Sequence, residues 1–278
     1  MFLVVGCNGQ LGNELKLLLQ DKAVYVDKDE LDITDKQAVS DFVTAQPFEA
    51  IINCAAYTAV DKAESDEKLA ELINVEGPRH LAATGVPLVH ISTDYVFDGT
   101  NCKPYVEEDT PNPQTAYGRT KLAGEKAVME TAKTAVIIRT AWLYSTFGNN
   151  FVKTMRKLGA ERDKLNVVFD QVGTPTYAGD LAKAIVAILP QIKAGMKEIY
   201  HFSNEGVCSW YDFALAIMAQ SDLDCQVFPI ESKEYPTPAK RPHYSVLNKA
   251  KIKRDFGIEI NNWAVSLAEC VEKLNNGL

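Results

Sequence analysis

The chain has 278 residues, enough for one large α/β unit or about two domains. Its hydrophobic fraction of 46% and charged fraction of 24% are ordinary for globular proteins, which excludes an intrinsically disordered chain. The net charge of −8, together with the lack of a long apolar run or a signal-peptide pattern, predicts a cytoplasmic protein with no nucleic-acid and no membrane partner. The six cysteines are scattered without metal-ligand spacing, so we expect reduced thiols and no metal site.

The first third of the chain alternates short β-branched segments with amphipathic ones. Buried strands are predicted at residues 2–5, 23–27, 50–54 and 87–92. After the first strand, leucines recur at i, i+4, i+7 and i+8 from Leu11, which is typical of a helix with one apolar face. This alternation predicts an α/β fold with a doubly wound parallel sheet, the Rossmann fold, and right-handed crossovers.

The series continues with strands predicted at 135–140 and 165–170 and with helices after Asn150 and Asp180. From about residue 199 the pattern loosens into a short strand, a helix near Ser209, a strand near Gln226 and two final helices. We interpret this tail as a smaller C-terminal α/β lobe that binds the substrate.

The expected dinucleotide-binding domain spans residues 1–145, with 165–198 returning to it, and the substrate-binding lobe combines 199–278 with 146–164. Two proline-rich connections, 99–118 and 234–245, are long for a compact domain. Connections of this kind tend to be functional.

A glycine turn with the spacing G-x-x-G-x-x-G joins the first predicted strand to the first helix. Glycines at this junction permit a tight turn and let backbone N–H groups approach a pyrophosphate. The turn therefore predicts a site for NADPH or NADH, rather than only a tight strand-to-helix connection. Its expected contact residues are Gly6, Asn8, Gly9, Gln10, Leu11 and Gly12.

Two side chains at the end of the second strand bear on cofactor preference. Asp27 lies 21 residues after Gly6, the distance at which a carboxylate holds the ribose hydroxyls of NAD. Lys28 follows directly and could accept the 2′-phosphate of NADP. The choice between NADPH and NADH therefore stays open.

Tyr117 and Lys121 are spaced i, i+4 and so share one face of a predicted helix. The spacing alone is also typical of a surface Tyr stacked on a Lys stem. Here, however, it follows a nucleotide-binding turn, and the polar run Ser92-Thr93-Asp94 ends the strand at 87–92. Because the carboxyl ends of parallel strands line the ligand crevice, we expect these side chains to meet there.

This combination resembles the extended short-chain dehydrogenase/reductase superfamily, and within it the dTDP-4-dehydrorhamnose reductase family, over nearly the whole chain. The resemblance rests on NCAAYTAVDKAE at 53–64, STDYVFDG at 92–99, YGRTKLAGE at 117–125, RTAW at 139–142 and YPTPAKRP at 235–242. It implies that NADPH or NADH reduces the 4-keto group of dTDP-6-deoxy-L-lyxo-4-hexulose, a dTDP-linked 4-keto-6-deoxyhexose, to give dTDP-L-rhamnose. The resemblance is also compatible with a homodimer.

The resemblance further implies roles for individual residues. Tyr117 would donate the proton and Thr93 would hold the substrate carbonyl oxygen. A phenol needs about 3 pKa units of help, about 4 kcal/mol, to exchange a proton near neutral pH, and we expect Lys121 to supply much of it. Further cofactor contacts are expected at Asp32, Ile33, Asn53, Ala55, Ala56, Tyr57, Ser92, Tyr117 and Lys121. Substrate contacts are expected at Thr93, Asp94, Val96, Tyr117, Trp142, Asn150 and Arg241.

For three of the expected substrate contacts, a purely structural role in the fold is the alternative. Trp142 offers a flat apolar wall to the deoxysugar but could also be a core residue. The Arg241 guanidinium suits bidentate capture of a diphosphate, but it could be a solvated surface group. Asn150 either touches the nucleotide or caps the helix that follows it.

Two alternative functions are compatible with a dinucleotide-binding fold. A nucleotide-sugar dehydratase or epimerase would share the fold, but dehydratases have Glu where this chain has Tyr95, so their acid/base pair is incomplete here. A non-catalytic NAD(P)-binding regulatory subunit would not need Thr93, Tyr117 and Lys121, and all three are present.

Overall fold

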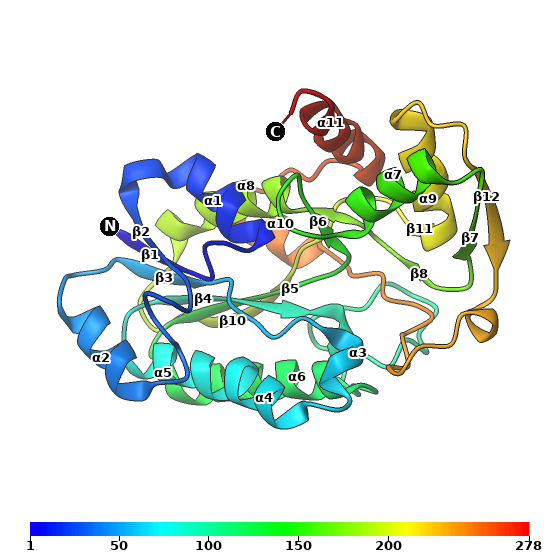
Figure 1. Ribbon diagram of the computed structural model, residues 1–278. Coiled ribbons are helices and arrows are strands. Elements are labelled where there is room, and N and C mark those ends of the chain that lie inside the picture. The colour runs from blue at the N-terminus through cyan, green and yellow to red at the C-terminus, as the bar shows by residue number, and fades with distance from the viewer. Residues whose placement is uncertain (278) are drawn as a thin grey trace.

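A parallel sheet runs through the centre of the protein (Figure 1). The computed structural model describes residues 1–277, and within them six strands are ordered β10-β5-β4-β3-β1-β2. Their bounds are Phe2–Val5 for β1, Ala23–Val26 for β2, Ala50–Asn53 for β3, Leu88–Thr93 for β4, Ala135–Thr140 for β5 and Lys197–His201 for β10. Every neighbouring pair is parallel, as the alternating sequence pattern predicts.

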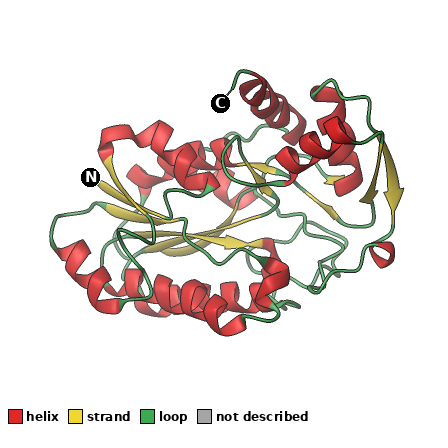
Figure 2. Ribbon diagram, viewed as in Figure 1, coloured by secondary structure: helices red, strands yellow, loops and turns green. Residues whose placement is uncertain are grey.

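Helices cover both faces of this sheet (Figures 1 and 2). One face carries α1 (Gln10–Leu19), α8 (Ala178–Ile188) and α10 (Ala250–Phe256). The other carries α2 (Lys36–Thr44), α4 (Glu67–Glu71), α5 (Gly77–Ala83) and α6 (Ala116–Thr131), with the short α3 (Val60–Ala63) beside them. Alternate strand residues such as Val4 and Leu3 point into the two separate apolar layers. The predicted doubly wound fold is confirmed.

Two strand assignments differ from the prediction. The strand expected at 165–170 is β7 (Lys164–Val168), and it pairs with β12 (Gln226–Ile230) outside the central sheet. Its burial alternates, with Lys164 and Asn166 exposed, whereas β5 is buried throughout. A strand buried on one face suits a small outer sheet and not the centre of a doubly wound sheet.

The short strand near residue 199, expected in the smaller lobe, is β10, and it extends the central sheet beside β5. The preceding α8 packs against α1 and so returns the chain to this sheet edge. The domain limits themselves stay a prediction. Two strands are corrected: β7 lies outside the central sheet, and β10 belongs to it.

The remaining elements form a second apolar core beside the sheet. They are α7 (Phe151–Glu161), α9 (Trp210–Gln220) and α11 (Trp263–Asn275), with β6 (Leu143–Tyr144) paired to β9 (Thr176–Tyr177) and β8 (Val172–Gly173) paired to β11 (Cys208–Ser209). We call this group the C-terminal lobe. The cysteines in the described residues are all unpaired. Among residues 1–277 no helix has the length and apolar character needed to cross a membrane.

Candidate active site

A cavity of about 920 Å³ opens where the central strands end. It lies at the carboxyl ends of β1 to β5, where the strand order reverses between β1 and β3. This is the place at which open α/β sheets bind ligands, and the volume is at the upper end of the range of about 300–1,000 Å³ for small-molecule sites.

Most of the residues predicted from the sequence line this cavity. They are Gly6, Asn8, Gly9, Gln10, Leu11, Gly12, Asp27, Lys28, Asp32, Ile33, Ala55, Ala56, Ser92, Thr93, Asp94, Tyr117, Lys121 and Trp142. Their contacts with ligands stay predictions, but the structure brings these segments together around one space.

The glycine turn forms the wall next to β1. Gly6 has a positive φ of 75°, and a Cβ there would lie 2.6 Å from the Ala55 nitrogen. A Cβ on Gly12 would lie 2.5 Å from the Gly6 carbonyl oxygen. At Gly9 the nearest atom is the same oxygen at 3.3 Å, so a Cβ there would meet the chain less closely than at Gly6 or Gly12.

Gly9 is also the N-cap of α1 and brings no side-chain cap, so first-turn N–H groups of α1 are available to an anion. The turn thus fits a dinucleotide pyrophosphate.

The end of β2 presents an anchored carboxylate to the same wall. Asp27 Oδ2 accepts a hydrogen bond from the Asn8 nitrogen at 2.9 Å, and Oδ1 accepts one from the Lys28 nitrogen at 2.8 Å. Farther along, Asp32 accepts hydrogen bonds from the nitrogen and hydroxyl of Thr34, which lower its pKa. Hydrogen bonds within the chain thus fix both carboxylates in position beside the cavity.

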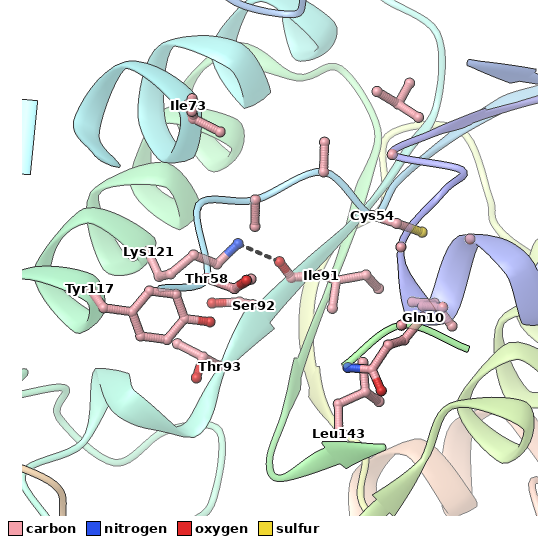
Figure 3. A pocket seen from close by; sticks show the side chains of 18 of the residues that line it. Gln10, Cys54, Thr58, Ile73, Ile91, Ser92, Thr93, Tyr117, Lys121 and Leu143 are labelled. Atoms are coloured by element: carbon pink, nitrogen blue, oxygen red, sulfur yellow. Dashed lines mark hydrogen bonds between the residues drawn. The ribbon is translucent and has the colours of Figure 1, made fainter. Parts of the chain in front are cut away.

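Tyr117, Thr93 and Lys121 converge at the end of β4 (Figure 3). Thr115 caps α6 by accepting a hydrogen bond from the Gly118 nitrogen at 3.0 Å. A Cβ on Gly118 would lie 2.2 Å from the Tyr95 carbonyl oxygen, so only glycine lets α6 pack this closely on the segment after β4. This close packing places the phenol of Tyr117 beside the Thr93 hydroxyl.

Burial sets the protonation of the pair. It raises the pKa of Tyr117 to about 12, the charge of Asp94 adds to the rise, and the Thr93 hydroxyl opposes it. Burial also lowers the pKa of Lys121 to about 8, against the charge of Glu125. Lys121 Nζ donates to the Ile91 carbonyl oxygen at 2.6 Å, the contact drawn in Figure 3.

The expected lowering of the Tyr117 pKa by Lys121 is wrong for the protein alone. The ammonium is directed to the main chain of β4, and burial of the phenol is the larger influence. A raised pKa keeps the phenol protonated at neutral pH. This is the form that a proton donor needs.

A buried ion pair supports this end of the sheet. Arg139 donates to both oxygens of Glu125, at 2.9 and 2.7 Å, and both side chains are only 2% exposed. Ser92 donates to the same carboxylate at 2.5 Å. Glu125 and Arg139 lie in the motifs 117–125 and 139–142, but no role was predicted for them, although the i, i+4 spacing of Lys121 and Glu125 was an available signal.

Trp142 also lines the cavity. Its φ is +47°, a strained value for a non-glycine residue, and its ring stacks on Trp210 with 3.6 Å between centroids. Trp142 lines the cavity and also packs against two apolar clusters, and its contact with a substrate stays a prediction. No sequence signal pointed to Trp210, which comes from α9 of the C-terminal lobe.

Five predicted residues lie behind the cavity wall. Asn53 is buried and accepts a hydrogen bond from the Ala55 nitrogen at 3.1 Å. Tyr57 is held through its main chain by the Asn74 amide. Val96 packs in a small apolar cluster.

Asn150 and Arg241 are the other two. Asn150 caps α7, the structural role left open for it, and it also donates to Gln10 Oε1 at 3.0 Å. Arg241 makes a bidentate ion pair with Asp61 at 2.9 and 2.8 Å. Their nitrogen donors are thus engaged within the protein, although Gln10 itself lines the cavity.

Other residues that line the cavity were not predicted individually, although Val5, Cys54, Thr58, Val60, Tyr95 and Ala141 lie within the predicted strand or the motifs. They are Val5, Leu31, Thr34, Cys54, Thr58, Val60, Leu69, Leu72, Ile73, Ile91, Tyr95, Thr140, Ala141, Leu143, Gly148 and Asn149. Several are apolar and give the cavity a largely hydrophobic wall, as is usual for cofactor sites.

Comparison with known proteins identifies the family. The family model described as the RmlD substrate binding domain matches residues 1–276. The chain is 42% identical to a dTDP-4-dehydrorhamnose reductase of Aggregatibacter actinomycetemcomitans, over 95% of this chain and 96% of that protein. It is 38% identical to a dTDP-4-keto-6-deoxy-D-glucose reductase of Streptomyces niveus, over 99% and 97%.

Solved structures agree. A dTDP-4-dehydrorhamnose reductase from Clostridium acetobutylicum has a TM-score of 0.95 and 44% identity over 99% of each chain. One from Bacillus anthracis, in complex with NADP, has a TM-score of 0.94 and 38% identity over 98% of each chain. The resemblance seen in the motifs is confirmed, and the chain belongs to the RmlD family, in which dTDP-4-dehydrorhamnose reductases stand beside reductases of other dTDP-4-keto sugars.

Proposed function

We propose that the protein reduces the 4-keto group of dTDP-6-deoxy-L-lyxo-4-hexulose with NADPH or NADH, giving dTDP-L-rhamnose. The observation that supports this most is the meeting of Tyr117, Thr93 and Lys121 in the same cavity as the glycine turn. Dehydrorhamnose reductases among the relatives at about 40% identity support the choice of sugar.

The chain's own groups manage the proton and the position of the ketone. The bound nicotinamide supplies the hydride. Thr93 donates its hydroxyl hydrogen to the carbonyl oxygen and so orients the ketone. Tyr117, protonated at neutral pH, gives that oxygen the proton that completes the alcohol, a contribution of about 10²- to 10⁴-fold. Lys121 adds positive charge near the resulting phenolate.

The cofactor lies along the glycine turn, with its pyrophosphate at the N-terminus of α1. Asp27 holds the ribose hydroxyls, and Lys28, exposed beside it, receives a 2′-phosphate when NADPH is used. The NADP complex of the Bacillus anthracis relative supports this use of NADPH. Asp32, Ile33, Ala55, Ala56 and Ser92 complete the wall.

The sugar lies between Tyr117 and Trp142, with Asp94 beside it and Val96 supporting the wall. Arg241 faces the diphosphate and exchanges part of its contact with Asp61 for it. In this account the C-terminal lobe, which supplies Trp210, and the loop after β12, which supplies Arg241, bind the substrate.

A second candidate is the reduction of a different dTDP-4-keto sugar. It is favoured by the 38% identity to a dTDP-4-keto-6-deoxy-D-glucose reductase. A dehydratase or epimerase is disfavoured because Tyr95, whose ring packs edge-on against Tyr117, stands where dehydration needs an acid.

The test is cofactor oxidation with purified protein and four sugars: dTDP-6-deoxy-L-lyxo-4-hexulose, dTDP-4-keto-6-deoxy-D-glucose and the UDP form of each. We expect the first to give the highest kcat/KM, with one cofactor oxidised per sugar reduced. Preference for the second sugar would select the second candidate. Turnover without net cofactor oxidation, or no turnover with any sugar, would contradict both.

A further inference from the structure

Asp94 is a buried carboxyl at the catalytic end of the cavity. It is 2% exposed, lines the cavity and directly follows Thr93 in the chain. Its Oδ1 accepts a hydrogen bond from Thr93 Oγ1 at 3.0 Å, and its Oδ2 has no hydrogen-bond partner within residues 1–277. A carboxyl oxygen left unpaired at such depth is costly, so a role in handling a ligand or a proton is the physical explanation.

The groups that face Asp94 are hydroxyls rather than cations. Thr93 on β4 and Ser245, in the loop after β12, both favour its ionised form, while Tyr117 on α6 and the adjacent Tyr95 are phenols. The Arg241 guanidinium acts on Tyr95 and is paired with Asp61. Burial therefore dominates and raises the pKa of Asp94 to about 6, so this carboxyl exchanges its proton near neutral pH.

We propose that Asp94 is the proton reservoir for Tyr117, with the Thr93 hydroxyl as the bridge between them. The inference rests on the proposed function. Once Tyr117 has given its proton to the substrate oxygen, the Thr93 O–H proton moves to the phenolate oxygen. The Asp94 carboxylic proton then moves to the Thr93 oxygen. The products are a neutral phenol, an intact hydroxyl and a carboxylate, and no group is oxidised or reduced.

Lys121 is less suited to this task. Its ammonium is 1% exposed and donates one of its three N–H groups to the Ile91 carbonyl oxygen, which fixes it against the main chain of β4. Asp94 lines the cavity, and its carboxyl oxygen Oδ1 lies 3.0 Å from the Thr93 hydroxyl, the proposed bridge to Tyr117. Transfer from a carboxyl to a phenolate is also downhill, because the Tyr117 phenol is the weaker acid.

The test is Asp94→Asn, which keeps the shape of the side chain but cannot carry the proton. In the wild type we expect the kcat of reduction to fall, and that of the reverse oxidation to rise, as the pH increases through about 6. In Asp94→Asn both profiles flatten over that range and kcat falls about tenfold, while the KM of the sugar stays within about twofold. An unchanged profile, or a raised KM with unchanged kcat, would overturn the relay.

An infrared titration of the ligand-free protein gives a readout that does not depend on turnover. We expect a protonated-carboxyl band that disappears with a midpoint near pH 6, is absent in Asp94→Asn and persists in Asp222→Asn. Asp222 is an exposed carboxylate in the turn after α9, so its replacement makes the same charge change away from the cavity. A wild-type protein without such a band would contradict the proposal even if Asp94→Asn failed to fold.

Two further variants separate the relay from the proposed function. Thr93→Ser keeps the bridging hydroxyl and the wild-type pH profile, whereas Thr93→Val loses activity. Full activity in Tyr117→Phe would contradict the proposed function itself. An inactive Tyr117→Phe together with a wild-type profile in Asp94→Asn would contradict only the relay.

Discussion

The two ends of the cavity are built from different materials. The end next to β1 is backbone: at Gly6 and Gly12 even a methyl group would lie within about 2.6 Å of the main chain. At the other end Trp142 lines the cavity, and side chains behind the wall hold one another: Trp210 stacks on Trp142, and Arg241 pairs with Asp61. A backbone wall cannot be altered without moving the fold, whereas a side-chain wall can be altered one residue at a time. We therefore expect substitutions at the first end to affect stability, and those at the second to affect substrate binding.

The largest effect expected is that of Gly12→Ala. The new Cβ would lie 2.5 Å from the Gly6 carbonyl oxygen and 2.6 Å from Cys7 Cα, so the turn must shift. We expect the free energy of unfolding to fall by about 3 kcal/mol in urea titrations. Gly9→Ala is the matched control: it should remain within about 1 kcal/mol of the wild type but bind NADPH more weakly. Equal stability of the two variants would contradict the account.

Asp94→Asn is expected to stabilise the protein in a pH-dependent way. Folding raises the pKa of Asp94 from 3.8 to about 6, so the folded state holds this proton more tightly than the unfolded state. The carboxyl's contribution to stability therefore declines as the pH rises from about 4 to 6, and the full cost, up to about 3 kcal/mol, is present above pH 6. The variant should gain up to that amount at about pH 8 and little at about pH 4. A gain that is the same at both values would contradict the shift.

Trp210→Leu tests the side-chain end of the cavity. Trp210 holds Trp142 by stacking, and aromatic pairs contribute about 0.5–1.5 kcal/mol beyond their buried area. We expect the KM of the sugar nucleotide to rise about fivefold and the Kd of NADPH to stay unchanged. Trp263→Leu removes an aromatic ring from the same lobe without touching Trp142, and should leave the KM unaltered.

Asp61→Asn is expected to have the smallest effect. The Asp61–Arg241 pair is partly exposed, and such pairs contribute about 0.2–1 kcal/mol. Asp61 also accepts a hydrogen bond from the Ala239 nitrogen at 3.1 Å, so hydrogen exchange at this amide should speed up by a few fold. Glu67→Gln, which breaks the exposed pair of Glu67 with Arg119, should leave exchange at Ala239 unchanged. Unchanged exchange in Asp61→Asn would contradict the anchoring role.

Features coded by local spacing could be predicted from the sequence. The glycine turn, the strands that flank it and the i, i+4 pair of Tyr117 and Lys121 each depend on a short segment, and the structure places all of them at one cavity. The parallel order of strands then brings their carboxyl ends together.

Features that depend on packing between distant segments could not be predicted. Asp61 and Arg241 are far apart in the chain, and the Trp142–Trp210 stack exists only once the C-terminal lobe has docked. The pairing of β7 with β12 could likewise not be predicted, because it depends on how both strands are buried in the folded protein. The raised pKa of Tyr117 follows from burial, which the spacing of Tyr117 and Lys121 does not encode.

The most direct test of the account is Tyr117→Phe, which removes one oxygen and leaves the ring in place. Cofactor oxidation with the 4-keto sugar should lose at least about a hundredfold in kcat, the scale of general acid catalysis. The thermal midpoint and the Kd of NADPH, measured on the same preparation, should match those of the wild type. A variant that binds NADPH normally and retains the wild-type kcat would contradict the claim that this phenol is the proton donor.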